Sequence, residues 1–266
     1  MSIWGNPVML GKTGGGGLHG DMPPTSDIGS DGDIYTQVYT DSTLTGDGAS
    51  YINTVIYPSS RFALELVAAL TQTVPDSYQT LFGTRNGSVA QYSIRFGPIN
   101  SAENGYLGIQ KSNSPTASAE FYASTALSQN TMLNQFHKIS FGFDLSTLNF
   151  YYAEDGTQKN TYDTSGNSNT FPYSWYLFGL NYTGSTDDTM SHMALKSFKA
   201  WDNNNNIVGY FVPYLDGNTP CALNLVTGTK HYNLGTGDFT YTATGTVKVG
   251  LVWLKENGAW SIIGHS

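Results

Sequence analysis

Hydrophobic and polar positions alternate along most of the chain from Asp33 onward. Residues 33–40, 50–57 and 61–68 show this period of two and are bounded by glycine, proline, serine or aspartate. A strand buried on one face requires such alternation, because successive side chains point to opposite faces. We therefore expect many short strands and very little helix. Further candidate strands follow at residues 80–83, 91–96, 106–110, 119–123, 137–143, 148–153, 174–180, 193–201 and 207–212.

Turn sequences separate several of these segments. Asp155-Gly156, the asparagine-rich stretch 202–206 and Asn257-Gly258 favour tight hairpins, because aspartate, asparagine and glycine tolerate positive φ. Charged residues make up only 12% of the chain, which favours pleated surfaces over salt-bridged helices. The regular spacing of strands and turns predicts an all-β, two-sheet sandwich. A threonine- and glycine-rich stretch near 242–246 predicts a linker before a small C-terminal β-hairpin, residues 243–266.

Residues 1–32 differ in composition from the rest. Four consecutive glycines, further glycines and three prolines leave too little apolar area to offset the entropy of ordering the chain. We expect a flexible arm whose apolar start, around Trp4, Val8 and Leu10, docks on a partner. The sandwich itself is then expected at residues 33–242.

Charge and cysteine content exclude several classes of protein. The formal net charge is −8 with only 12 lysines and arginines, so we expect no binding to nucleic acid. Cys221 is the one cysteine, so an intramolecular disulfide is impossible and folding in a reducing cytoplasm is expected. No basic leader and no apolar run of about 20 residues occur, which predicts neither a signal peptide nor membrane insertion.

Several segments, taken in order, resemble a known family. Together they are similar to the concanavalin A-like (laminin-G-like) jelly-roll domains, a lectin and glucanase class, found in bacteriophage tail, fibre and other virion proteins. Asn53 and Asn224 stand where the family has acidic residues, and Tyr210 stands where a charged residue is common. The resemblance covers roughly residues 49–242. The segments that carry it are 49–58, 80–85, 134–141, 195–202, 207–214, 222–233 and 235–240.

The resemblance implies a fold and a biological role. It implies a concanavalin A-like jelly roll within a virion structural protein, made in the host cytoplasm and acting as a tail, fibre or decoration protein. The N-terminal arm would attach to other virion proteins, several copies would assemble as a homo-oligomer, and the jelly roll would bind host-surface glycan. Two alternatives are a carbohydrate-processing enzyme of the glucanase-like class and a purely structural decoration protein that binds no glycan.

Catalytic patterns are weak. A glycosidase of this architecture needs two carboxylates on one strand face. None of the five glutamates has a carboxylate two or four residues away on a predicted strand, so we expect no enzyme activity. The phosphate-loop-like Gly11-Lys12-Thr13 lacks its leading glycine and its flanking strand and helix. No G-x-S-x-G elbow is present, and the five histidines show no metal-ligand spacing.

We expect no cofactor, with calcium left open. Laminin-G-like modules hold calcium with loop carboxylates, and Asp187 and Asp188 lie in such a loop. Asp31 and Asp33 form a second acidic pair without a distal glutamate, so solvated turns are the favoured interpretation of both.

Carbohydrate binding combines an exposed aromatic ring with carboxylates and amides that bond sugar hydroxyls. Trp175 and Trp201 fall in predicted strands and are assigned to the core. The candidate carbohydrate-binding residues are those in predicted loops: Tyr106, Tyr182, Asp187, Asp188, Tyr214 and Asp216.

Overall fold

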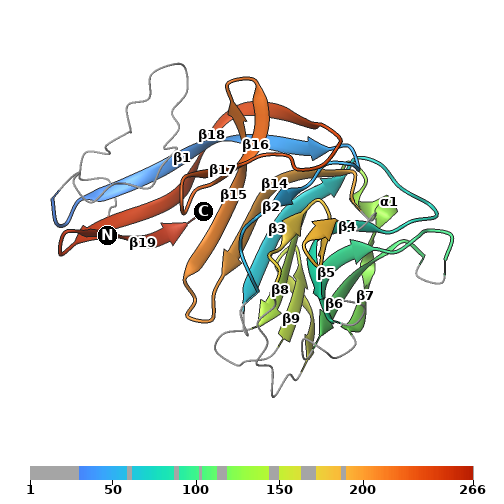
Figure 1. The fold of residues 1–266 in the computed structure, drawn as a ribbon. Helices are drawn as coiled ribbons and strands as arrows, with labels where there is room; N and C mark the ends of the chain where they lie inside the picture. Colours follow the sequence, from blue (N-terminus) through green and yellow to red (C-terminus); the bar gives the residue numbers. More distant parts are fainter. Residues whose placement is uncertain are drawn as a thin grey trace.

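A computed structural model describes residues 30–58, 62–86, 90–101, 104–112, 119–143, 150–162, 172–186 and 190–265. These residues form two packed β-sheets with a single short helix, α1 (Gln129–Met132), within the described ranges. The predicted all-β jelly-roll sandwich is therefore confirmed (Figure 1). Most of the predicted arm, residues 1–29, lies outside the described residues. No helix in the described part is long and apolar enough to cross a membrane.

The larger sheet is antiparallel throughout its main path. Three further strands, β15 (Ile207–Asp216), β16 (Thr219–Asn224) and β17 (Thr229–His231), branch from β14. The main path runs in the order β10 (Thr157–Tyr162), β9 (Phe150–Glu154), β8 (His137–Phe143), β3 (Ala63–Leu70), β14 (Met193–Trp201), β1 (Ile34–Gly46), β18 (Phe239–Glu256) and β19 (Ala259–His265).

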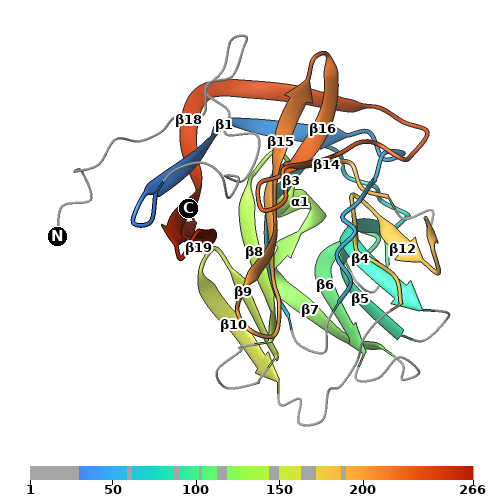
Figure 2. The ribbon, with the colours of Figure 1, turned by 60° about the vertical axis from the view of Figure 1, so that its left-hand side comes forward.

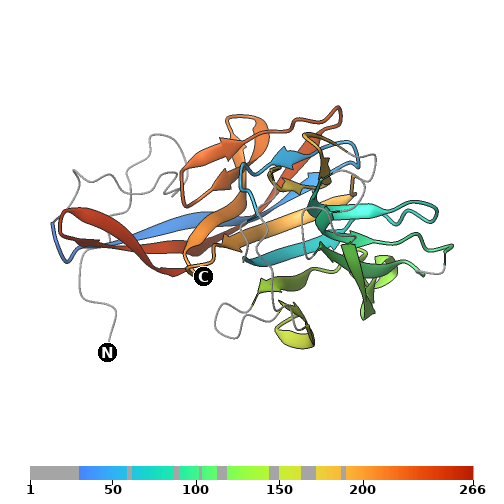
Figure 3. The ribbon, with the colours of Figure 1, turned by 60° about the horizontal axis from the view of Figure 1, so that its bottom comes forward.

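The smaller sheet covers one face of the larger sheet (Figures 1 and 3). Two short strands extend from β4: β11 (Tyr176–Leu177) pairs with β4, and β2 (Ile52–Asn53) pairs with β11. Its main order is β13 (Ser185–Thr186), β12 (Leu180–Tyr182), β4 (Gln79–Asn86), β5 (Ala90–Phe96), β6 (Tyr106–Ser112) and β7 (Ala119–Ser128).

An aromatic core lies between the two sheets. Phe62 packs edge-on against Trp175 with ring centres 4.9 Å apart, and Phe82 lies 5.2 Å from Phe141. All four are fully buried. Aromatic rings bury 150–250 Å² each, so a few of them supply much of the apolar burial that offsets chain entropy. The prediction that Trp175 belongs to the core is confirmed.

The larger sheet forks at β14. One end of β14 pairs with β1 at Leu44 and Thr45, whereas the other end pairs with β15 from Phe198 to Trp201. The β1–β18–β19 branch and the β15–β16–β17 branch therefore diverge, as Figure 2 shows. A second core fills the angle between the branches on the side away from the smaller sheet. Its buried residues are Tyr39, Ile207, Tyr210, Val212, Leu223, Leu225, Leu251 and Trp253.

The C-terminal segment belongs to this sheet. β18 begins at Phe239 and pairs with β1 over nearly all of its length, so the linker predicted at 242–246 lies inside a strand. Its glycine, Gly245, has a φ of 80° beside a shift in register, which makes that stretch a bulge. The turn predicted at Asn257-Gly258 is confirmed, since both residues have positive φ, as do Asp155 and Gly156.

His231 at the end of β17 ties this branch to the smaller sheet. Its ring Nδ1 lies 2.9 Å from the carbonyl oxygen of Asn53 in β2, and its ring packs edge-on against Phe211. Burial lowers the pKa of His231, although the bond to Asn53 opposes this. The folded protein therefore favours the neutral ring.

Replacing Phe82 by alanine is expected to cost roughly 3–5 kcal/mol of unfolding free energy, because it opens a cavity between the sheets. Urea denaturation measures this. The matched control is Tyr106→Ala, since Tyr106 is a 36% exposed aromatic residue in the same sheet. That change should alter stability by at most about 0.5 kcal/mol. Equal losses for both variants would contradict the described core.

Lowering the pH should reduce the stability of the folded protein through protonation of His231. Because the folded-state pKa is depressed, stability is complete above the unfolded pKa of about 6.5 and is lost as the pH falls through the folded-state value. We expect the melting temperature to fall between pH 7 and pH 5, and His231→Asn to flatten that fall. His265→Asn, at an exposed position, is the control. An unchanged pH slope in His231→Asn would contradict the assignment.

Candidate functional site

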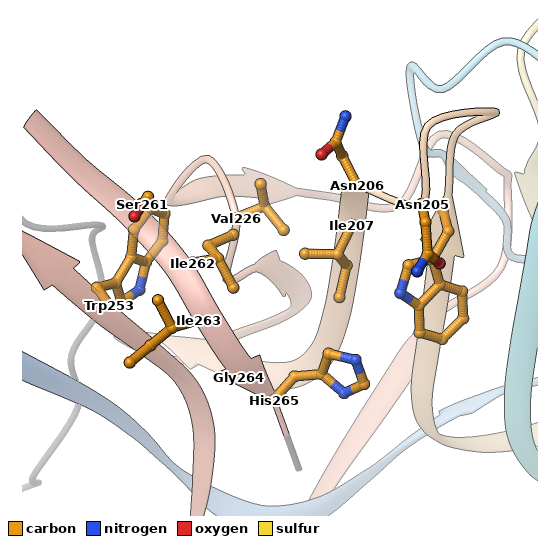
Figure 4. A pocket seen from close by; sticks show the side chains of 11 residues that line it. Asn205, Asn206, Ile207, Val226, Trp253, Ser261, Ile262, Ile263, Gly264 and His265 are labelled. Atoms are coloured by element: carbon orange, nitrogen blue, oxygen red, sulfur yellow. The ribbon is translucent and has the colours of Figure 1, made fainter.

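An open groove lies where the two branches diverge, and we call it the fork groove (Figure 4). Its volume is about 670 Å³. One wall comes from the β18–β19 hairpin, and the other comes from the turn between β14 and β15. The lining residues are Trp201, Asn205, Asn206, Ile207, Val226, Trp253, Ser261, Ile262, Ile263, Gly264 and His265.

Two tryptophans supply aromatic surface to the groove. Trp201 is half-buried at the end of β14, and its ring centre lies 5.6 Å from that of His265 at the end of β19. Trp253 on β18 is only 7% exposed and also belongs to the second core. Strand alternation places Trp201 on the face of β14 opposite the inward-facing Phe198 and Ala200. The sequence assigned Trp201 to the core; it is half-buried against the second core and also contributes to the groove wall.

Asp202 fixes the turn that carries the two asparagines. Its Oδ1 accepts hydrogen bonds from the backbone N–H groups of Asn204 (2.8 Å) and Asn206 (2.9 Å), and its Oδ2 accepts one from Asn206 Nδ2 (3.1 Å). Burial alone raises the pKa of Asp202, but these bonds outweigh it and lower the pKa below its ordinary value. The carboxylate therefore stays ionised and holds Asn205 and Asn206, both exposed, at the lip of the groove.

The indole nitrogen of Trp253 is buried and has no hydrogen-bond partner among the described residues. An indole N–H can only donate, and leaving a buried donor unpaired costs about 1–3 kcal/mol. Ser261 on the same wall is exposed, and its hydroxyl donates weakly to the Leu254 carbonyl at 3.4 Å. The groove thus combines a donor without an acceptor, two amides, a hydroxyl and aromatic surface. This combination suits the hydroxyls and apolar faces of a sugar.

Two of the predicted carbohydrate-binding residues meet in a different place. Tyr214 and Asp216, at the end of β15, gather with Lys230 and Tyr232 into a group that we call the rim cluster. Lys230 Nζ lies 2.8 Å from Asp216 Oδ1 and 5.2 Å from the centre of the Tyr214 ring, and the Tyr232 hydroxyl donates to Asp216 Oδ2. The bonds from Lys230 and Tyr232 lower the pKa of Asp216. Its carboxylate is therefore already occupied.

The remaining predicted residues do not join the rim cluster in the described structure. Tyr182 ends β12, where the Arg85 guanidinium lies 5.3 Å from its ring centre, and Tyr106 begins β6. Both strands belong to the smaller sheet, whereas the rim cluster belongs to the larger one. Asp187 and Asp188, the candidate calcium-binding residues, lie outside the described residues.

The other acidic residues of interest form ion pairs or hydrogen bonds. Glu65 on β3 lies 3.4 Å from both Lys199 Nζ and Lys138 Nζ. Burial lowers the pKa of Lys199, and Glu65 opposes that shift. Asp31 and Asp33 accept backbone hydrogen bonds from Gly258 and Ser30. Within the described ranges, no group of three or more histidine, cysteine or acidic residues could hold a metal.

Several groove residues carried no signal in the sequence. Asn205 and Asn206 were identified only as turn residues, and Trp253 and His265 were placed in a separate hairpin.

Burial raises the pKa of Cys221 to about 11, so this buried thiol is not a reactive candidate.

No family model and no curated protein match the chain. Among solved structures, a protein of Bacteroides ovatus described as a proposed carbohydrate-binding protein aligns with a TM-score of 0.54 and 12% identity, over 82% of this chain and 71% of that one. A pentraxin of Limulus polyphemus aligns with a TM-score of 0.45 and 8% identity, over 79% and 95%. The laminin α1 domains LG4-5 of mouse align with a TM-score of 0.43 and 10% identity, over 86% and 50%. At 12% identity, the Bacteroides protein shows a shared fold with this chain.

Proposed function

We propose that the protein binds carbohydrate and that the fork groove is its binding site. The observation that carries this proposal is the presence of Trp201, Trp253 and two exposed asparagines around one open groove. Sugar rings present apolar C–H faces and a rim of hydroxyls, so a site needs aromatic surface beside neutral donors and acceptors. The description of the similar Bacteroides protein as a proposed carbohydrate-binding protein is consistent with this function.

We further propose that binding occurs without turnover. Glycoside hydrolysis needs two carboxyl groups roughly 5–10 Å apart across the scissile bond. The eleven residues that line the fork groove include no aspartate or glutamate, and the carboxylate of Glu65 is paired with two lysines. Both observations support a lectin-like role over the glucanase-like alternative.

The biological setting that we propose is the bacteriophage virion. Several segments resemble virion jelly rolls and follow one another in the same order along the chain. Together with the glycine-rich arm of residues 1–32, they support a tail, fibre or decoration protein made in the host cytoplasm. The arm would join other virion proteins, and repeated copies would present several grooves to host-surface glycan. Presentation in several copies strengthens weak binding without any new contact.

Removing aromatic surface from the groove should weaken glycan binding. Trp201→Ala is expected to weaken binding by at least tenfold on a glycan array or in affinity electrophoresis, because an aromatic platform is lost. His265→Ala, at an exposed position beside Trp201, should weaken it by roughly threefold.

Tyr106→Ala is the matched control for these variants, since Tyr106 is an exposed aromatic residue in the other sheet. It should leave binding unchanged. Loss of binding in Tyr106→Ala but not in Trp201→Ala would contradict the fork groove. Release of smaller sugars from the retained glycan would support the enzyme alternative, and retention of no glycan would favour the purely structural role.

The virion proposal predicts that the chain copurifies with phage particles. Mass spectrometry of particles banded in a density gradient should detect its peptides at a constant ratio to the major capsid protein. A chain found only in the lysate supernatant would contradict the proposal.

A further inference from the structure

We propose that the fork groove selects neutral sugars over acidic ones and binds one sugar oxygen through the indole N–H of Trp253. This inference rests on the proposed function and goes beyond it, since it names the class of carbohydrate and the atom that recognises it. Two independent observations carry it: the charge of the lining and the unpaired donor of Trp253.

The lining is uncharged. None of the eleven lining residues is an aspartate, glutamate, lysine or arginine. Asp202, at the turn that carries the lip, is ionised and bonded to Asn206. The chain as a whole carries a formal charge of −8.

These charges discriminate against an acidic sugar. A uronate or sialate entering the groove would lose hydration without meeting a cation, and a buried charge without a partner is strongly unfavourable. It would also approach a negative molecule and the ionised Asp202. A neutral sugar loses nothing by the lack of a cation, because amide, hydroxyl and indole groups satisfy its hydroxyls. The groove therefore selects against acidic sugars, because only they would pay the free-energy cost of an unpaired charge.

Trp253 supplies a specific donor. Its side chain is 7% exposed, its Nε1 has no partner among the described residues, and it lines the groove beside Ser261 and Ile262. The second core holds the ring in place, so the N–H is oriented before a ligand arrives. A sugar hydroxyl or ring oxygen would accept this bond and remove the penalty of an unpaired buried donor.

Binding should be measured at pH 8 with neutral hexasaccharides of glucose, mannose or galactose and with acidic hexasaccharides of galacturonate or mannuronate. We expect at least one neutral hexasaccharide to bind at least tenfold more tightly than either acidic one. Equal or tighter binding of an acidic hexasaccharide would overturn the inference and leave the proposed function standing. Binding of no glycan by the full chain would overturn the proposed function itself.

The contact is tested by the indole signals of the 15N-labelled protein. The chain has five tryptophans, and the signal of Trp253 is the one lost in Trp253→Phe. Saturation with the bound hexasaccharide should shift this signal, and Trp253→Phe should weaken binding by roughly two- to tenfold, the effect of one hydrogen bond. Trp260, which packs on Tyr35 outside the groove lining, is the matched control for both measurements. An unmoved Trp253 signal at saturation would overturn the assignment of the contact.

Discussion

The structure depends on the way in which β14 divides its pairing between two strands. Its first half bonds to β1 and its second half to β15, so the strands beyond it must separate. The angle between them would expose apolar surface on both branches, and the second core closes it. Tyr39 on β1 and Tyr210 on β15 meet there, with hydroxyl oxygens 3.2 Å apart. Gly250 lets β18 approach closely, because a Cβ at that position would lie 2.6 Å from Leu225. The fork is thus a packed feature of the fold.

The fork also determines where a ligand can bind. The second core fills the depth of the angle, whereas its mouth stays open between the β18–β19 hairpin and the turn at Asn205 and Asn206. Trp253 belongs to both the core and the groove, so the packing that stabilises the branch also orients the donor. The rim cluster differs in this respect, because its carboxylate is already bonded to Lys230 and Tyr232. The fork groove, in contrast, has no aspartate, glutamate, lysine or arginine in its lining, which suits the proposed binding of neutral ligands.

Local sequence predicted the elements well and their partners poorly. Alternation identified β1, β3 and β14, and the asparagine and glycine turns were placed correctly, because side-chain period and positive φ are properties of short segments. The pairing of β18 with β1 joins residues about 200 positions apart, and no local pattern records it. For the same reason the groove beside Trp201 could not be predicted: alternation tells which residues share a face, but not which face is covered. Tyr214 and Asp216 were identified, whereas Lys230 and Tyr232, which complete their cluster, became visible only once β17 was placed beside β16.

The central claim is that carbohydrate occupies the mouth of the fork. A crystal structure of the full chain grown with a bound neutral oligosaccharide tests it most directly. The account predicts a sugar ring between Trp201 and Trp253, with one of its oxygens within hydrogen-bond distance of Trp253 Nε1. A sugar bound at the rim cluster or on the smaller sheet, with the fork left empty, would contradict it.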